Sequence, residues 1–170
     1  MAFFFVSLVP FVFKSLRRED CLPEIIIRPL TPADRDEWLR MRLALWPEDT
    51  AGELSAEMEK MLADQAAAVI VAERPGGGLG GFVEAGTRPY AEGCDTSPVG
   101  YIEGWYVDPD LRRQGVGGRL IRAAEDWARG LGLQEMGSDT WIWNETSIQA
   151  HLSLGYREAE RLVTFCKKLT

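Results

Sequence analysis

The chain has 170 residues, of which 46% are hydrophobic and 26% charged, a composition that is ordinary for a single globular domain. Its 26 acidic and 19 basic side chains give a formal net charge of −7, which argues against a nucleic-acid partner and suits a cationic ligand. Solubility alone would explain the acidity equally well. The single histidine, His151, rules out a multi-histidine metal site, so we expect no metal.

The three cysteines, Cys21, Cys94 and Cys166, form no C-x-x-C pair, which is typical of a reducing cytoplasm and predicts no disulfide framework. The first residues, MAFFFVSLVPFVF, are strongly apolar but too few to span a bilayer, and positive charges follow them instead of preceding them. We treat residues 1–23 as an extension outside the fold, either a membrane-surface anchor or a consequence of where the start was placed. Residues 24–170 are expected to form one domain that requires no membrane partner.

Hydrophobic periodicity predicts strands and helices that alternate from residue 24 onward. A β-branched run indicates a strand at residues 24–30, and helical spacing indicates helices at residues 33–45 and 53–67. Strands are expected at residues 68–74, 81–88 and 99–107, followed by a helix at 116–130. The remaining elements are a strand at 133–141, a short helix at 144–154 and a closing hairpin or bent strand at 155–169. This order predicts an α/β (by stricter labels α+β) fold with a mixed sheet and helices on its faces.

Two glycine-rich segments have the composition of phosphate-binding loops. Gly76, Gly78 and Gly81 satisfy G-x-G-x-x-G after a strand, but the next residues, FVEAG, form another strand. A dinucleotide-binding fingerprint needs a helix at that point, so we predict a hairpin turn instead.

The second segment is YVDPDLRRQGVGGRL, residues 106–120, which contains R-x-x-G-x-G between a predicted strand and a predicted helix. Glycines let the backbone approach a phosphate closely, and a helix N-terminus presents unpaired N–H groups to it. Four arginines between residues 111 and 122, with no acid among them, add positive charge. On these residues alone, an anion-binding loop and a tight turn with surface arginines explain the pattern equally well.

This loop, the preceding EGWYVDPDLR and the downstream NETSIQAHLSLGY together resemble the GNAT superfamily of acetyltransferases over nearly all of residues 25–169. The resemblance implies a mostly antiparallel central sheet with a parallel splay between two central strands and helices on both faces. It also implies acetyl-CoA as co-substrate, with its pyrophosphate on the loop amides and its pantetheine arm in the splay. The cofactor-binding residues implied in this way are Trp105, Tyr106, Val107, Arg113, Gln114, Gly115, Val116, Gly117, Gly118 and Asn144.

The stretches LALWPED, EAGTRPYAEGCDTSPVGYIEGWYVDPDLRRQGVGGRLI, SDT and GYREAERLVTFCKK are similar to the aminoglycoside 6′-N-acetyltransferases. This similarity implies a cytoplasmic resistance enzyme that acetylates the 6′-amino group of aminoglycosides, and a homodimer. The acceptor-binding residues that it implies are Trp46, Asp49, Tyr90, Glu103, Asp139 and Glu160. Trp46 and Tyr90 could equally be core aromatics, and Glu160 a solvated strand residue.

The charge distribution along the chain agrees with a cationic acceptor. Residues 84–110 hold one base, Arg88, and six acids, namely Glu84, Glu92, Asp95, Glu103, Asp108 and Asp110, which predicts a cation-attracting wall beside the arginine-rich loop. Glu103 lies within an apolar and aromatic strand, where an unpaired carboxylate is costly to bury. It either binds the acceptor amine or is tied to a nearby arginine inside the sheet.

The chemistry of amide formation requires a base, because a primary ammonium must lose a proton before it attacks a thioester. Asp139 is the candidate base, directly or through water, although an Asx cap on the turn SDTWIWN is the alternative. His151, in the helix slot where many GNAT enzymes place a tyrosine, is the candidate acid for the leaving thiolate or else a packing histidine. The remaining alternatives are a GNAT enzyme for another cationic amine, such as a polyamine or a protein N-terminus, and a non-catalytic acyl-CoA-binding module.

Overall fold

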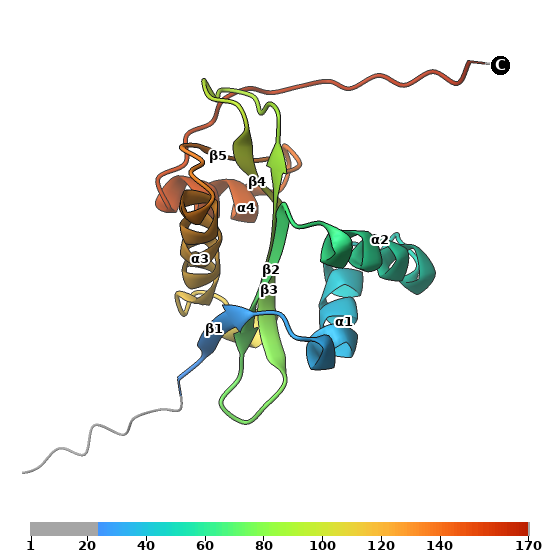
Figure 1. Cartoon of the computed structure of the whole chain (residues 1–170), viewed down its shortest axis with the longest axis vertical. Coiled ribbons are helices and arrows are strands. Elements are labelled where there is room, and N and C mark those ends of the chain that lie inside the picture. Colours follow the sequence, from blue (N-terminus) through green and yellow to red (C-terminus); the bar gives the residue numbers. More distant parts are fainter. Residues whose placement is uncertain (1–23, 170) are drawn as a thin grey trace, which may run out of the picture.

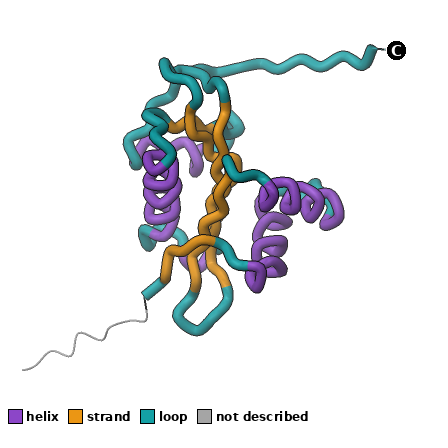
Figure 2. Tube along the Cα trace, viewed as in Figure 1, coloured by secondary structure: helices purple, strands orange, loops and turns teal. Residues whose placement is uncertain are grey.

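The structure, a computed structural model, describes residues 24–169, so the expectations for residues 1–23 lie outside it. The described chain forms one five-stranded sheet, in the order β1-β2-β3-β4-β5, with helices on both faces (Figure 1). Helices α1 and α2 cover one face and α3 and α4 the other (Figure 2). The strands are β1 (Ile26–Pro29), β2 (Ala67–Glu73), β3 (Leu79–Arg88), β4 (Val99–Val107) and β5 (Met136–Ser138). The helices are α1 (Arg35–Leu45), α2 (Ala51–Ala63), α3 (Val116–Gly130) and α4 (Glu145–Ser153), with 3-10 turns η1 (Pro32–Asp34) and η2 (Pro109–Leu111).

The sheet is antiparallel from β1 to β4 and parallel between β4 and β5. The parallel pairing covers only Gly100–Ile102 against Met136–Ser138, after which β4 continues to Val107 paired with β3 alone. This confirms the predicted mixed sheet with one parallel pair, and the pair opens where β5 ends. Within residues 24–169, β5 is an edge strand.

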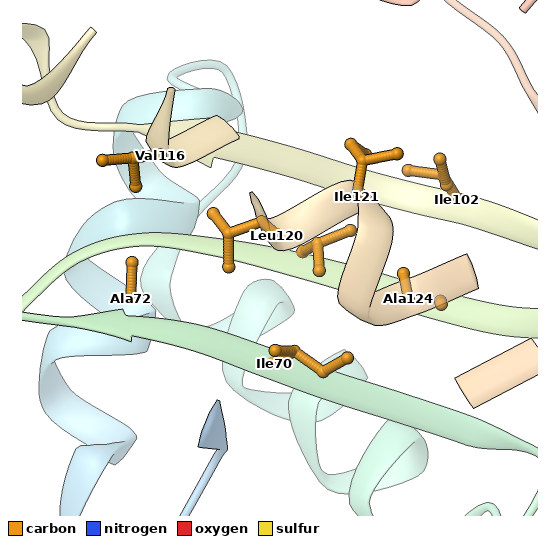
Figure 3. Packing of buried hydrophobic residues seen from close by; sticks show 9 residues of the cluster. Ile70, Ala72, Ile102, Val116, Leu120, Ile121 and Ala124 are labelled. Atoms are coloured by element: carbon orange, nitrogen blue, oxygen red, sulfur yellow. The ribbon is translucent and has the colours of Figure 1, made fainter. Parts of the chain in front are cut away.

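The two cores lie on the two faces of the sheet. Residues three or four apart along α3 share one helix face, and Figure 3 shows that face packed on β2 and β4. Its members are Val116, Leu120, Ile121 and Ala124 of α3, with Ile70 and Ala72 of β2 and Ile102 of β4. On the opposite face, α1 and α2 bury Trp38, Met41 and Met58 against Val71 and Phe82. Burying such side chains contributes roughly 1.5–3 kcal/mol each, so the two cores fix α1 and α3 against the central strands.

The glycine-rich segment between β2 and β3 is the predicted hairpin turn. Gly77 and Gly78 have φ angles of 90° and 76°, a region that suits glycine, and the Arg74 amide donates to the Gly78 carbonyl at 2.9 Å. Helix α2 begins earlier than predicted because Thr50 and Glu53 form a capping box. It ends earlier too, at Ala63 instead of residue 67.

Two predictions for the C-terminal third are corrected by the structure. The strand expected over residues 133–141 is reduced to Met136–Ser138, and the closing hairpin or bent strand expected over residues 155–169 is wrong. That segment first packs on the domain through Tyr156 and Arg157 and then leaves it as an extended arm (Figure 1), with Phe165 94% exposed. A strand needs a neighbouring strand to pair its backbone groups, and the arm has none within the described chain.

Candidate active site

The R-x-x-G-x-G segment connects β4 to α3. Arg113 and Gly115 both have left-handed backbones, with φ angles of 59° and 80°, and Gly115 precedes the first residue of α3 without a side-chain cap. The first amides of an α-helix have no acceptor within the helix, so those that begin at Val116 are free for a ligand. Left-handed residues before a helix turn successive N–H groups into one concavity. The geometry therefore suits a phosphate group.

Buried ion pairs hold this loop in place. Asp108, at the end of β4, is buried and accepts hydrogen bonds from Arg40 of α1 at 3.1 Å and from Arg74 at 2.9 Å. Burial opposes its ionisation, but these hydrogen bonds prevail and lower the pKa of Asp108. Arg74 also binds Asp110, and Arg112 donates to the Val107 carbonyl at 2.9 Å.

These contacts correct one part of the charge prediction. Asp108 and Asp110 do not belong to a wall that attracts the acceptor, because arginines of the domain neutralise both. Glu92 and Asp95 lie in the loop between β3 and β4, which the Glu135 carboxylate holds by accepting from the amides of Asp95 and Thr96. Glu84 and Glu103 lie on the sheet face, and each of them is also paired with an arginine, Arg42 and Arg88 respectively.

Helix α3 lies unusually close to β4 at Trp105. A Cβ atom added to Gly117 would be 2.8 Å from Cζ2 of Trp105, so only glycine allows this approach. The indole Nε1 of Trp105 is buried there and has no hydrogen-bond partner. An unpaired buried donor costs about 1–3 kcal/mol, which an acceptor atom of a ligand would relieve.

Three features of this region together fit acetyl-CoA. The free amides at the start of α3 suit a pyrophosphate, the open edge of β4 from Glu103 onward suits an amide-containing pantetheine arm, and the indole of Trp105 offers one more donor. Asn144 caps α4, with its Oδ1 accepting from the Ser147 amide at 3.2 Å, and α4 packs beside α3 through Leu154, 3.2 Å from a Cβ built on Gly118. The pantetheine contact expected of Asn144 stays a prediction.

A β-bulge shapes the opposite side of β4. Glu84 pairs with Gly104 and Ala85 with Ile102, so Glu103 is the extra residue. Ile102 points into the core under α3, whereas a Cβ on Gly104 would meet the Trp46 ring at 2.7 Å on the face of α1. Ala85 of β3 faces α3, so the next residue, Gly86, faces α1. Glu103 lies on the α1 face as well, because its Oε1 would be 3.5 Å from a Cβ built on Gly86. The bulge thus brings Glu103 and the ring of Trp46 to one face.

A buried carboxylate lies beneath this face. Glu84 is only 1% exposed, accepts from the Trp38 indole at 2.7 Å and pairs with Arg42 at 3.4 Å. Arg42 in turn lies 4.8 Å from the centre of the Trp46 ring, so the pair supports that ring from below. Burial raises the pKa of Glu84 to about 7, although the charge of Arg42 and the Trp38 hydrogen bond act the other way. Sequence reasoning missed this support, for which an arginine within the apolar face of α1 was the available signal.

Glu103 is tied to an arginine, as one of the two sequence hypotheses held. Arg88, the last residue of β3, donates to both oxygens of Glu103, at 3.0 and 2.5 Å. The guanidinium also lies over the ring of Tyr101, 3.4 Å from its centre. Burial acts to lower the pKa of Arg88, but Glu103, Tyr101 and Asp139 together raise it.

Asp139 follows β5 directly and is exposed. Burial and then the charge of Asp139 raise the pKa of Tyr101 to about 12, so the carboxylate lies close to the phenol and to Arg88. The turn after it closes through the backbone, with the Asn144 amide donating to the Trp141 carbonyl at 2.8 Å. Trp46 and Glu103 thus lie on the α1 face of the sheet, Asp139 follows the strand that pairs with β4 at Tyr101, and the anion-binding loop follows the C-terminal end of β4.

His151 lies on the α3 face of the sheet in a hydrogen-bond network. Its Nδ1 is 2.8 Å from the Ser147 carbonyl oxygen, to which it must donate, and its Nε2 lies 2.9 Å from the Ser138 hydroxyl oxygen. The ring packs edge-on against Trp105 and Tyr156. These contacts are those of a packing histidine, and an acid role at the sulfur stays a prediction.

Within residues 24–169, no side-chain hydrogen bond or ion pair joins the other three predicted acceptor residues to Glu103 or Asp139, and their roles stay predictions. Asp49 is exposed in the turn after α1, its amide donating to the Trp46 carbonyl at 3.2 Å, and Tyr90 is 63% exposed after β3. Glu160 lies on the extended C-terminal arm. No group of three or more His, Cys, Asp or Glu side chains within residues 24–169 is placed to hold a metal ion. In the same range, no helix combines the length and hydrophobicity needed to cross a membrane.

Comparison with known proteins agrees with this geometry. A model described as "Acetyltransferase (GNAT) family" matches residues 35–156. The chain is 44% identical to the aminoglycoside N(6')-acetyltransferase type 1 of Klebsiella aerogenes, over 85% of this chain and 97% of that protein. It is 40% identical to the protein of the same name from Stenotrophomonas maltophilia, over 82% of this chain and 90% of that one.

Solved structures agree as well. The apo 6'-N-acetyltransferase AAC(6')-IG from Acinetobacter haemolyticus has a TM-score of 0.81 and 38% identity, over 85% of this chain and 99% of that one. AAC(6')-Iy, in complex with the bisubstrate analogue CoA-S-monomethyl-acetylneamine, has a TM-score of 0.82 and 34% identity, over 86% of this chain and 99% of that one. These likenesses confirm the predicted fold and the predicted kind of enzyme. The chain therefore belongs to the acetyltransferase (GNAT) family and, within it, to the aminoglycoside 6'-N-acetyltransferases.

Proposed function

We propose that this protein transfers the acetyl group of acetyl-CoA to the 6′-amino group of aminoglycosides, in the cytoplasm, and so confers resistance. The observation that carries the proposal is the arrangement around β4. A loop suited to a phosphate group follows β4, and one edge of β4 has no strand partner from Glu103 to Val107. The carboxylate of Glu103 and the ring of Trp46 lie on the face of β4 that α1 covers. The names of the relatives supply the acceptor, and the bound analogue of AAC(6')-Iy, which joins CoA to an acetylneamine, supplies the pairing of substrates in that protein.

The transfer proceeds by direct attack of the amine on the thioester carbonyl. Asp139, directly or through water, takes the proton of the acceptor ammonium, and Glu103 and Trp46 hold the acceptor. A backbone N–H at Val107 stabilises the oxyanion, because β4 has no strand partner on that edge there. His151 is the available acid for the thiolate, although its two ring nitrogens are engaged with Ser147 and Ser138.

A homodimer also belongs to the proposal. The arm after Tyr156 carries apolar side chains with nothing to cover them, Leu162, Val163, Phe165 and Leu169, which are 58–94% exposed. Strand β5 is at the same time an unpaired sheet edge within the described residues. An exposed edge strand and an exposed apolar arm favour association. In such a dimer the arm, and Glu160 with it, would lie against the partner subunit.

The proposed function is tested by measuring release of the CoA thiol from acetyl-CoA with kanamycin, tobramycin or spermidine as acceptor. We expect turnover with the aminoglycosides and reduced aminoglycoside potency against a susceptible bacterium that expresses the gene. Turnover with spermidine but with neither aminoglycoside would show that the acceptor is a polyamine and would refute the proposed function. Binding of acetyl-CoA without thiol release for any acceptor would indicate a non-catalytic module.

The role of Asp139 is tested by Asp139→Asn. General bases contribute about 10²–10⁴-fold, so we expect kcat to fall within that range while the affinity for acetyl-CoA stays unchanged. The matched control is Asp126→Asn on the exposed side of α3, which removes a carboxylate whose one side-chain partner within residues 24–169 is Arg129. An unchanged kcat for Asp139→Asn would remove Asp139 as the base.

A further inference from the structure

Glu103, the carboxylate proposed to bind the aminoglycoside, already holds a cation of the protein itself, the guanidinium of Arg88. Arg88 donates two hydrogen bonds to Glu103, so the planar guanidinium covers the two oxygens that an acceptor ammonium would contact. Tyr101 offers its ring face to the same guanidinium at 3.4 Å, and the charge of Asp139 acts on it as well. One side chain therefore engages three groups that could each recognise an ammonium.

The resident cation has a physical reason. The Glu103 side chain is 28% exposed, and Glu84 and Asp139 place further negative charge near it. Like charges gathered in a partly buried site repel one another, and an internal counter-ion relieves the repulsion when no acceptor is bound. Arg88 is 41% exposed and stands at the last position of β3, next to the loop that follows, so its side chain has room to swing into solvent.

We propose that Arg88 is a specificity determinant that stands in for the acceptor, and that a bound aminoglycoside must displace it from Glu103. This inference rests on the proposed function. An ammonium that bound beside the guanidinium would meet a like charge at short range, so the acceptor gains full access to Glu103 only when Arg88 leaves. A weakly charged amine cannot compensate for the lost ion pair as well as an aminoglycoside with several ammonium groups, which therefore competes better.

The test is Arg88→Gln, which removes the positive charge and leaves a shorter, neutral side chain with an amide donor. Because a half-exposed ion pair is a weak competitor, we expect the KM of tobramycin to fall by roughly twofold to fivefold, with the KM of acetyl-CoA unchanged. The slope of log(kcat/KM) against log salt concentration should also become steeper, because one more carboxylate charge then faces the acceptor. Arg129→Gln removes an exposed ion-paired arginine from α3, and we expect it to change none of these quantities.

Arg88→Lys separates displacement from a purely structural role. If Arg88 only orients Glu103, Arg88→Gln raises the KM of tobramycin and Arg88→Lys restores it. If Arg88 is displaced, Arg88→Lys gives a KM between those of the wild type and Arg88→Gln, because it keeps the charge but loses the two-point contact. A tobramycin KM that rises or stays the same in Arg88→Gln would overturn the proposal, and if that variant does not fold, Arg88→Lys decides by the same criterion. Failure of the wild type to acetylate any aminoglycoside would instead refute the proposed function.

Discussion

Replacing Glu84 by alanine is the most direct test of the buried support beneath Trp46. The substitution leaves the guanidinium of Arg42, whose side chain is 5% exposed, without its buried partner, and it leaves the Trp38 indole N–H without its acceptor. Removing one member of a buried pair costs about 3–5 kcal/mol. Arg42 keeps Glu57 at 2.8 Å and the Leu54 carbonyl at 3.2 Å, so we place the loss at the lower end, about 3 kcal/mol.

The free energy of unfolding is measured by equilibrium unfolding in urea at pH 8, where the carboxyl is ionised. In thermal unfolding, the same loss corresponds, for a chain of this size, to a fall in Tm of about 6–12 °C. Glu59→Ala is the matched control, because Glu59 is 60% exposed in its ion pair with Arg35, and we expect it to cost below about 1 kcal/mol. Combining Arg42→Met with Glu84→Leu should recover most of the loss, since neither charge then remains buried.

The functional consequence follows from the contact between Arg42 and Trp46. When the guanidinium loses Glu84, the ring that it supports at 4.8 Å loses its defined position, so the KM of the aminoglycoside should rise more than that of acetyl-CoA. A loss of less than about 1 kcal/mol in Glu84→Ala, with both KM values unchanged, would refute this account of the site.

Three further predictions follow from other contacts. Gly117→Ala would drive a methyl group into Trp105, so we expect the Kd of acetyl-CoA, measured by calorimetry, to rise by about tenfold or more while Gly130→Ala, where the added atom meets nothing, binds normally. The pKa of Glu84 in the folded protein is about 7, above its ordinary 4.5, so the folded protein holds a proton that the unfolded chain releases. The unfolding free energy of the wild type, relative to that of Glu84→Gln, should therefore fall by about 1–3 kcal/mol as the pH rises from 4.5 to 7. A difference between the two proteins that does not change with pH would contradict the pKa shift. Phe165→Asp should lower the mass measured by light scattering from that of a dimer to that of a monomer, and a wild-type monomer would count against the dimer.

Local signals predicted much of the architecture. The helical spacing of Val116, Leu120 and Ala124 placed α3 correctly, because an amphipathic helix must bury one face wherever it lies. The glycines of the β2–β3 connection identified a hairpin, since a second strand follows them directly. The prediction for the end of the chain was wrong for the opposite reason. Residues 155–169 have strand-like composition, but a strand exists only where a neighbour pairs with it, and neighbours are not encoded locally.

The residues of the site divide in the same way. The sequence alone indicated the family and singled out the loop at Gly115 and the carboxylate of Glu103, because motif spacing and an acid in an apolar strand are visible along the chain. Only the tertiary structure decided that Glu103 sits on a bulge, that Arg88 fifteen residues earlier neutralises it, and that Glu84 and Arg42 support Trp46 from beneath. These are contacts between separate strands and helices, whose charges balance or repel according to distances in space, and distance in space is not a property of the order of residues.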